Sequence, residues 1–301
     1  MIDRIIDLAD SPAYLRVQNR QLVIERDGVE PVSTPLSEAA VIIAAHPQVR
    51  CSRPMLAELM QAGGAFIVCD ERCLPVGLML PLVGNALQSQ RIAAQAAAPV
   101  PLRKRLWQQI VRRKISAQAD LLRDLRGDDH GLAQLAPTVR SGDPDNREAV
   151  ASRRYWPALF DDPNFHRRFD APDANRLLNY GYAVLRAVMG RAICGAGLHP
   201  SLGLHHHHRE NAFCLADDLL EPYRPWVDAA VVDHVRAGRG VELDRAAKTA
   251  LLEAVLARYR ADGEVRTLFD LCARTAVSLV RVLEKQSDRL DYPIKLTDAA
   301  R

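Results

Sequence analysis

The chain has 301 residues, of which 48% are hydrophobic and 26% are charged, the composition of an ordinary soluble globular protein. This composition excludes a disordered chain, and the length is enough for roughly two domains. No stretch approaches the roughly 20 uninterrupted apolar residues of a membrane span, and the N-terminus lacks the pattern of a secretory signal. We therefore expect a cytoplasmic protein without a membrane partner. The six cysteines form no CxxC pair, so neither a zinc ribbon nor a disulfide framework is indicated.

The net charge of +3 comes from 40 basic and 37 acidic residues and says little by itself. Its distribution is more informative. Residues 1–84 carry a net charge of −3, whereas residues 85–126 carry +7. A local basic stretch in a near-neutral chain is typical of a surface for an anionic partner, although it can also be a merely solvated face.

The first 80 or so residues are predicted to be rich in β-strands. Short runs with alternating or β-branched character predict strands at 14–17, 21–25, 40–44, 65–69 and 74–78. Pro54 opens a predicted short helix at 55–61, which Gly63 and Gly64 end.

The pattern changes after about residue 83, where helical spacing takes over. Helices are predicted at 85–98, 102–125, 144–159, 173–194, 213–221, 226–237, 244–260 and 264–286. The fold class is therefore α+β, with a small β-rich domain at 1–84 and a larger all-α domain at 85–301. The helix at 102–125 carries a cluster of basic residues: Arg103, Lys104, Arg105, Arg112, Arg113 and Lys114.

Three places in the helical part could carry chemistry. Glu148 lies in the first turns of a helix that Asp143 can cap and Pro144 can open, although an acid there is often only a favourable charge at a helix start. Residues 205–208 are four consecutive histidines in a glycine-rich loop, which could bind a divalent metal specifically or adventitiously. Asp218 and Glu221 are i, i+3 neighbours, so their carboxylates can share one helical face, either as a cation site or as a solvated acidic face.

Together, these residues support a metal site better than each one does alone. A glutamate, a loop histidine and acids on a following helix would form a mixed nitrogen and oxygen site. Such a site suits Mg²⁺ or Mn²⁺, and the imidazole favours Mn²⁺ without excluding Mg²⁺. An ion of this kind can activate a hydroxyl and stabilise charge on a phosphodiester, and basic helices nearby would bind the nucleic-acid backbone.

Several ordered motifs resemble the CRISPR-associated adaptation endonuclease, the integrase subunit that inserts spacers. They are residues 145–149 (DNREA), 175–183 (NRLLNYGYA), 211–213 (NAF) and 215–225 (LADDLLEPYRP). The region 69–92 is similar to the linker of that family, and the ending of the last motif looks like the branch found with type II, single-effector loci.

The resemblance implies an N-terminal β-domain, a C-terminal helical catalytic domain and a divalent-metal site of one Glu, one His and one acid. Matched motif by motif, Glu148 is the first ligand, Glu221 the last acid and Asp218 a supporting acid. The family's two histidines fall on His205 and His206, and His206 is favoured as the ligand. His207 and His208 extend the run beyond the usual pair, so any of the four histidines could be the ligand.

The implied reaction is transesterification, in which the 3′-hydroxyl of a captured DNA fragment attacks the CRISPR array at the leader-proximal repeat. Implied partners are double-stranded DNA, a second copy of the chain, and a small ferredoxin-like protein that completes a heterohexamer. In type II systems, the effector nuclease and a ring-shaped accessory protein join them. We expect Arg153 and Arg154, with the basic residues of 103–114, to contact phosphates.

Two other classes of protein compete with this interpretation. One is a DNA-binding scaffold of the same fold whose metal site is idle. The other is a cytoplasmic metal sensor built on the histidine tract, which explains neither the basic helix nor the two motifs around Glu148 and Glu221.

Overall fold

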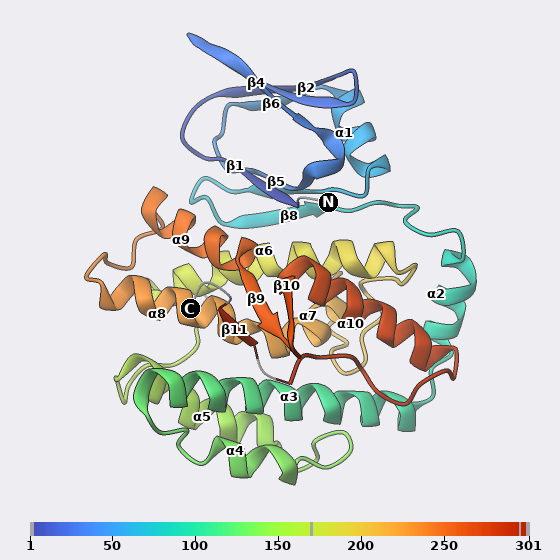
Figure 1. Cartoon of the computed structure of the whole chain (residues 1–301), viewed down its shortest axis with the longest axis vertical. Helices are drawn as coiled ribbons and strands as arrows, with labels where there is room; N and C mark the ends of the chain where they lie inside the picture. The colour runs from blue at the N-terminus through green and yellow to red at the C-terminus, as the bar shows by residue number, and fades with distance from the viewer. Residues whose placement is uncertain (1–2, 169–170, 295, 299–301) are drawn as a thin grey trace.

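The computed structural model describes residues 3–168, 171–294 and 296–298. The N-terminal strands form two four-stranded sheets, drawn in blue in Figure 1. In order across the first sheet lie β1 (Arg4–Leu8), β5 (Ala39–Ala44), β7 (Ala65–Cys69) and β8 (Pro75–Met79). The second sheet contains β4 (Val29–Pro35), β3 (Gln21–Arg26), β2 (Ala13–Gln18) and β6 (Val49–Cys51).

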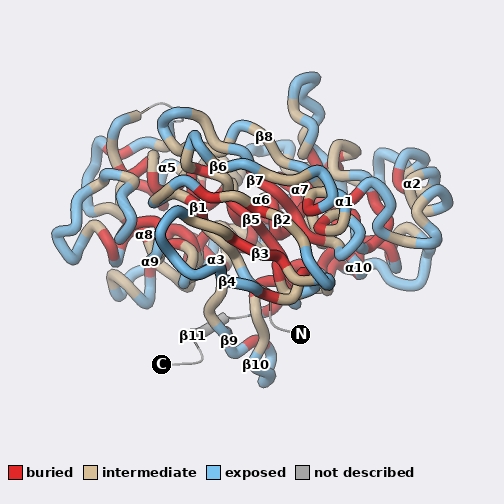
Figure 2. The backbone as a smooth tube through the Cα atoms, turned by 90° about the horizontal axis from the view of Figure 1, so that it is seen from above, coloured by how far each residue is buried: buried red, intermediate tan, exposed pale blue. Residues whose placement is uncertain are grey.

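The two sheets enclose a small core of their own. It includes Leu15, Leu22 and Ile42, none of which is exposed to solvent. Helix α1 (Arg53–Gln61) adds Met55 and Leu59 to it and begins at Ser52, whose hydroxyl accepts the N–H of Met55. Strand β5 is buried on both faces, because Ile42 belongs to this core while Val41 and Ile43 belong to the core of the helical part. Figure 2 shows buried segments in red along the middle of the sheets.

The helical part begins after the linker that follows β8. Its longer helices are α2 (Gln88–Ala96), α3 (Val100–Arg126), α5 (Arg147–Phe160), α6 (Ala174–Gly195), α8 (Arg224–Arg236), α9 (Arg245–Leu256) and α10 (Leu268–Leu283). The shorter ones are α4 (Leu132–Leu135), α7 (Cys214–Leu220) and the 3₁₀ turns η2 (Ala136–Thr138) and η3 (Glu221–Tyr223). A further 3₁₀ turn, η1 (Leu36–Glu38), lies between β4 and β5.

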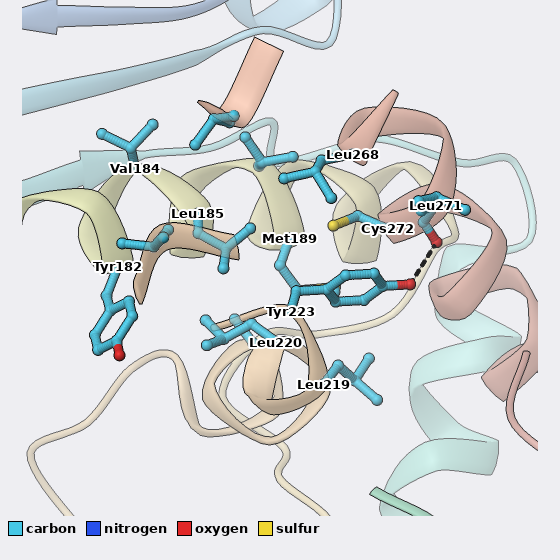
Figure 3. Packing of buried hydrophobic residues seen from close by; sticks show 14 of the residues in the cluster. Tyr182, Val184, Leu185, Met189, Leu219, Leu220, Tyr223, Leu268, Leu271 and Cys272 are labelled. Carbon is cyan, nitrogen blue, oxygen red and sulfur yellow. Dashed lines mark hydrogen bonds between the residues drawn. The ribbon is translucent and has the colours of Figure 1, made fainter. Parts of the chain in front are cut away.

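Helix α6 is the centre of the helical part. It packs against α8, α9 and α10, and also against the first sheet through β5, β7 and β8, so that it lies between the sheets and α3 in Figure 1. Figure 3 shows its core, in which Tyr223 of η3 projects among leucines and donates a 3.2 Å hydrogen bond to the carbonyl of Leu271. Because one apolar cluster runs through the helices and reaches the first sheet, the site described below has a rigid support.

The α+β class is confirmed, with one difference in the C-terminal part. Strands β9 (Arg258–Ala261), β10 (Glu264–Thr267) and β11 (Leu296–Asp298) form a small antiparallel sheet within the region expected to be all helical. The predicted helix at 244–260 therefore ends early, because Asp262 and Gly263 both adopt positive φ and turn the chain into a hairpin.

The predicted strands and helices are otherwise found within a few residues of their expected bounds. Strands β1, β4 and β6 were not predicted. Of the helices in the described ranges, none has the length and apolar character needed to cross a lipid bilayer.

Candidate metal site and its surroundings

Glu148 lies in the first turn of α5, and its backbone is held by a capping network. The Asp143 carboxylate accepts the N–H groups of Arg147 and Glu148 at 2.8 and 3.0 Å. Asn146, in the left-handed conformation, is the N-cap and accepts the N–H of Ala149. The N-cap is therefore Asn146 rather than the predicted Asp143, whose carboxylate instead supports the first two N–H groups of the helix, and Pro144 lies before the first helical residue. These bonds fix the direction in which Glu148 leaves the helix.

Glu221 forms the 3₁₀ turn η3 that joins α7 to α8, and its side chain is only 6% exposed. Arg224 pairs with its Oε1 at 3.0 Å. Its Oε2 is buried and faces the ammonium of Lys114 at 2.7 Å. Burial by itself would raise the pKa of this carboxyl, but Arg224 and Lys114 together hold the pKa below its usual value. Glu221 is therefore a buried carboxylate that two cations keep ionised.

Lys114 on α3 connects the two glutamates. Its ammonium lies 2.5 Å from Glu148 Oε1 and 2.7 Å from Glu221 Oε2. Burial would lower the pKa of this ammonium, but the charges of Glu221 and Glu148 outweigh burial and raise it. The two carboxylates that the sequence predicted as metal ligands therefore converge on one positively charged point. Lys114 was predicted to contact DNA phosphates. Its ammonium instead pairs with Glu148 and Glu221 inside the site.

The histidine loop is tied down by Asp218, which is completely buried. The carboxylate accepts backbone N–H groups from Leu204, His205 and His206 at 2.6, 2.9 and 3.3 Å. It also accepts Nδ1 of His206 at 2.6 Å, a bond that raises the pKa of that imidazole. A carboxylate has about four lone-pair sites, and all are used here. Asp218, predicted as a supporting acid of the metal site, thus holds the histidine loop with all its lone pairs.

Gly203 explains why the loop can close so tightly over Asp218. A β-carbon at this position would lie 2.3 Å from the backbone oxygen of His206 and 3.1 Å from Asp218 Oδ2. Because neither atom can move without breaking the loop, only glycine fits. Residues 203–206 therefore form a tight loop around the Asp218 carboxylate.

The first two histidines have different surroundings. His205 stacks on the ring of Trp107 of α3, with centroids 4.2 Å apart and planes 2° from parallel. Burial and the neighbouring His206 lower the pKa of His205. His206 meets Trp107 edge-on and keeps Nδ1 on Asp218, so that Nε2 is its available nitrogen. His207 and His208 are exposed. This arrangement favours His206 as a ligand and His205 as a packing residue.

The predicted DNA-binding residues fall into two groups. Arg112 is engaged within the fold, because its guanidinium donates to the carbonyls of Pro137 and Val139. Arg103 and Arg113 are partly buried, and burial lowers the pKa of Arg113. The remaining four are exposed on α3 and α5: Lys104, Arg105, Arg153 and Arg154.

The donor set fits a hard divalent cation, because two carboxylates converge and a carboxylate orients the imidazole of His206. Within the described ranges, however, no three His, Cys, Asp or Glu side chains stand close enough together to hold a metal ion. The two glutamates are joined, whereas His206 faces Asp218. Electrostatically, His206 still interacts with both Glu221 and Glu148.

Sequence reasoning did not find two parts of this site. Arg224 lies three residues after Glu221, a spacing that predicts an ion pair in a helical segment, so the signal was present. Trp107 gave no such signal, because its contact with His205 joins residues that are far apart in the chain.

Comparison of the sequence with known proteins identifies a matching family. The family model described as CRISPR associated protein Cas1 matches residues 8–254. A protein of Neisseria meningitidis serogroup C, named CRISPR-associated endonuclease Cas1, is 40% identical over 235 residues, which cover 77% of this chain and 76% of that protein. A protein of Pyrobaculum aerophilum, named CRISPR-associated endonuclease Cas1 2, is 28% identical and covers 92% of this chain and 98% of its own length.

Solved structures share the fold. A casposase bound to its integration product superimposes with a TM-score of 0.78 at 19% identity, covering 99% of this chain and 96% of that one. A CAS1 protein from Thermotoga maritima gives a TM-score of 0.75 at 18% identity, covering 93% and 97%. The family model spans most of the described fold, including Glu148 and Glu221, and the predicted family is thereby confirmed: the chain belongs to the CRISPR associated protein Cas1 family.

Proposed function

We propose that this chain is a divalent-metal-dependent DNA endonuclease and integrase of CRISPR adaptation. It joins the 3′-hydroxyl ends of captured DNA fragments to the leader-proximal repeat of the array. The observation that carries this proposal is the convergence of Glu148 and Glu221 on one cationic point beside the loop that presents His206. Membership of the Cas1 family and the endonuclease names of its relatives support the class of activity.

Glu148, Glu221 and His206 would hold the ion, Mg²⁺ or Mn²⁺, with His205 as the alternative histidine. A divalent ion bound there supplies activation of the attacking hydroxyl and neutralises charge that develops on the phosphate. The residues of the chain prepare this site. Asp218 holds Nδ1 of His206 so that Nε2 is the nitrogen left for a ligand bond. Arg224 fixes one oxygen of Glu221 and leaves the other directed at the site.

The exposed cations Lys104, Arg105, Arg153 and Arg154 would bind DNA phosphates. Such contacts fix the position of the duplex without reading its bases. Arg103 and Arg113 are partly buried, and Arg112 and Lys114 already have partners in the protein. We therefore assign phosphate binding to the four exposed residues rather than to the whole predicted cluster.

We also propose that residues 85–301 form the catalytic domain and residues 1–84 the domain that binds a second copy and the adaptation partner. In support, β8 is an edge strand that exposes Val76 at 67%, and the linker after it exposes Leu82 at 86%. Such an exposed apolar strip suits an interface. Structural neighbours include complexes titled as Cas6-RT-Cas1 with Cas2 and a TtCas1–DNA complex.

The expected assembly is a homodimer pair bridged by the small ferredoxin-like partner into a heterohexamer on double-stranded DNA. The motifs around Glu221 support the type II branch, in which the effector nuclease and the ring-shaped accessory protein would take part. The work would be done in the cytoplasm. An idle, DNA-binding scaffold is the alternative function, but it does not account for the pair of converging glutamates and the oriented His206.

The test is integration of short labelled duplexes into a supercoiled plasmid that carries a leader and repeat, with the small partner present. Reactions contain Mn²⁺, Mg²⁺ or EDTA, and the variants are Glu148→Gln, Glu221→Gln and His206→Ala. Arg176→Ala, which removes an exposed ion pair with Glu242 away from the site, is the control. Metal-dependent transfer of label that all three variants lose and the control keeps supports the proposal. Tight DNA binding without transfer in any metal would establish the scaffold alternative instead.

A further inference from the structure

A buried hydrogen bond joins the helix that carries Glu148 to α8, the helix that directly follows the turn with Glu221. Tyr155 of α5 donates to Oδ2 of Asp228 of α8 at 2.7 Å. Tyr155 is completely buried and Asp228 is 1% exposed. The two residues are 73 positions apart in the chain, so their contact is a feature of the tertiary structure alone.

The position of this bond relative to the site follows from the sequence separations along the two helical segments. Tyr155 comes seven residues after Glu148, and Asp228 comes seven residues after Glu221. Seven residues are about two turns of a helix, so each pair lies on one face of its helical segment. The same two segments are therefore connected at two levels. At the site, Lys114 of α3 pairs with both glutamates, and two turns further along, Tyr155 bonds directly to Asp228.

A second tyrosine connects Asp228 back to the site. Tyr182 of α6 donates to the other oxygen of Asp228. The guanidinium of Arg224 lies over the ring of Tyr182, 4.5 Å from its centroid, and pairs with Glu221 at 3.0 Å. Figure 3 shows Tyr182 leaving α6 with its hydroxyl directed away from the helix. A continuous chain of contacts thus runs from Glu221 through Arg224, Tyr182 and Asp228 to Tyr155.

We propose that Asp228 is a positioning residue for the metal site, which sets the separation of Glu148 and Glu221 through its bonds to Tyr155 and Tyr182. This inference rests on the proposed metal site. Asp228 does not touch the site itself. Its carboxylate fixes α5 and α6 against α8 two turns below the site, so that the two glutamates start at a fixed spacing before an ion binds. Preset ligands bind an ion more tightly than ligands that must first be ordered.

The experiment measures Mn²⁺ binding to the full chain by isothermal titration and records thermal denaturation of each variant. Tyr155→Phe removes one hydroxyl and keeps the ring. Asp228→Leu removes both acceptors, whereas Asp228→Asn keeps an acceptor for one tyrosine and a donor toward the other. Tyr259→Phe is the matched control, because it also removes a buried hydroxyl that donates a hydrogen bond, here to the carbonyl of Ala254 on α9 at 2.6 Å, and it leaves the bonds of Asp228 untouched.

We expect Tyr155→Phe and Asp228→Leu to raise the Mn²⁺ dissociation constant by about tenfold, the lower end of the loss seen when groups that support metal ligands are removed. Asp228→Asn should restore a value close to that of the wild type. Tyr259→Phe should lower the melting temperature about as much as Tyr155→Phe without changing the dissociation constant. This last comparison separates positioning from general stability.

The outcomes distinguish this inference from the proposed function. If Glu148→Ala and Glu221→Ala bind Mn²⁺ as the wild type does, the metal site itself is wrong, and the inference fails with it. If those two variants lose binding while Tyr155→Phe and Asp228→Leu match the wild type, the metal site stands and the positioning role of Asp228 is refuted. A folded Tyr155→Phe decides the question even if Asp228→Leu does not fold.

Discussion

Asp218 and His206 face each other with Oδ1 and Nδ1 2.6 Å apart, and the same carboxylate also binds the backbone of the loop that carries the histidine. One buried acid thus fixes the loop, the ring orientation and the tautomer of His206. The pattern is that of a carboxylate that supports a metal-binding histidine. It explains how an exposed glycine-rich loop can still present one imidazole reproducibly.

Asp218→Asn tests this relationship. The amide has one acceptor oxygen where the carboxylate serves four donors, so we expect a lower melting temperature and a lower pKa for His206. Since the folded pKa of His206 is raised, its contribution to stability is full below the unfolded pKa and disappears as pH rises through the folded value. NMR titration of the imidazole checks both points. An unchanged His206 titration in the variant would contradict the assigned bond.

The four histidines should differ in effect. His206→Ala should abolish metal-dependent strand transfer, because it removes the oriented ring nitrogen. His205→Ala should leave transfer measurable and reduce stability, because it removes the ring stacked on buried Trp107. The exposed pair His207 and His208, changed together to alanine, serves as the control and should behave as the wild type. Loss of transfer in His205→Ala with activity retained in His206→Ala would reverse the ligand assignment.

Lys114→Met removes the charge between the two glutamates and keeps most of the side-chain volume. Removing one partner of a buried ion pair costs about 3–5 kcal/mol, and we expect about 3 kcal/mol here because Glu221 keeps Arg224. Mn²⁺ should recover part of this loss, since a ligand that binds only the folded state stabilises it. Urea unfolding with and without Mn²⁺ provides the measurement. The control is Lys104→Met on the same helix, where the side chain is exposed and stability should not change.

Asp228 predicts a dependence of stability on pH. Burial raises its pKa from 3.8 to about 6, although its bonds to Tyr182 and Tyr155 oppose the shift. A raised pKa means that the folded state resists ionisation, so stability is lost as pH increases from about 4 to about 6. The shift corresponds to about 3 kcal/mol at most. Compared with the wild type, Asp228→Asn should lack this decline between pH 4.5 and 7 in urea unfolding.

The matched control for this pH effect is Asp288→Asn, since that side chain is 89% exposed. It should leave the pH dependence unchanged. A wild-type protein and an Asp228→Asn variant with parallel stability curves over this pH range would show that Asp228 ionises normally in the folded state.

Phosphate binding can be separated from chemistry by its salt dependence. Each lost phosphate contact should reduce the slope of log K against log salt by about 0.9 for duplex DNA. We expect this change for single alanine substitutions of Lys104, Arg105, Arg153 and Arg154, and none for Arg112→Lys, whose guanidinium partners are backbone carbonyls. Fluorescence anisotropy with a labelled duplex at several salt concentrations checks the slopes. Slopes that do not differ from the wild type would exclude α3 and α5 as the DNA-binding face.

Much of the fold could be predicted because local pattern and tertiary structure agree. The apolar run at 65–69 is a strand that pairs on both sides, and the helical spacing of 102–125 is the single helix α3. Strand β4 was missed because its residues are mostly exposed, so no alternation of apolar residues marks it. The hairpin after α9 was missed because the same residues also fit a helical pattern.

Periodicity and motifs of fixed spacing were enough to predict the fold class and the family, which are confirmed, and to select Glu148 and Glu221, whose carboxylates the structure brings together. The directions in which the side chains face could not be predicted in this way. Lys114 turns into the site while Lys104 on the same helix remains exposed. Asp218 and Glu221, three residues apart, turn to different partners. The pairing of Tyr155 with Asp228 also joins distant segments. Spacing along a chain limits which residues can share a face, but the packing of other helices determines what that face meets.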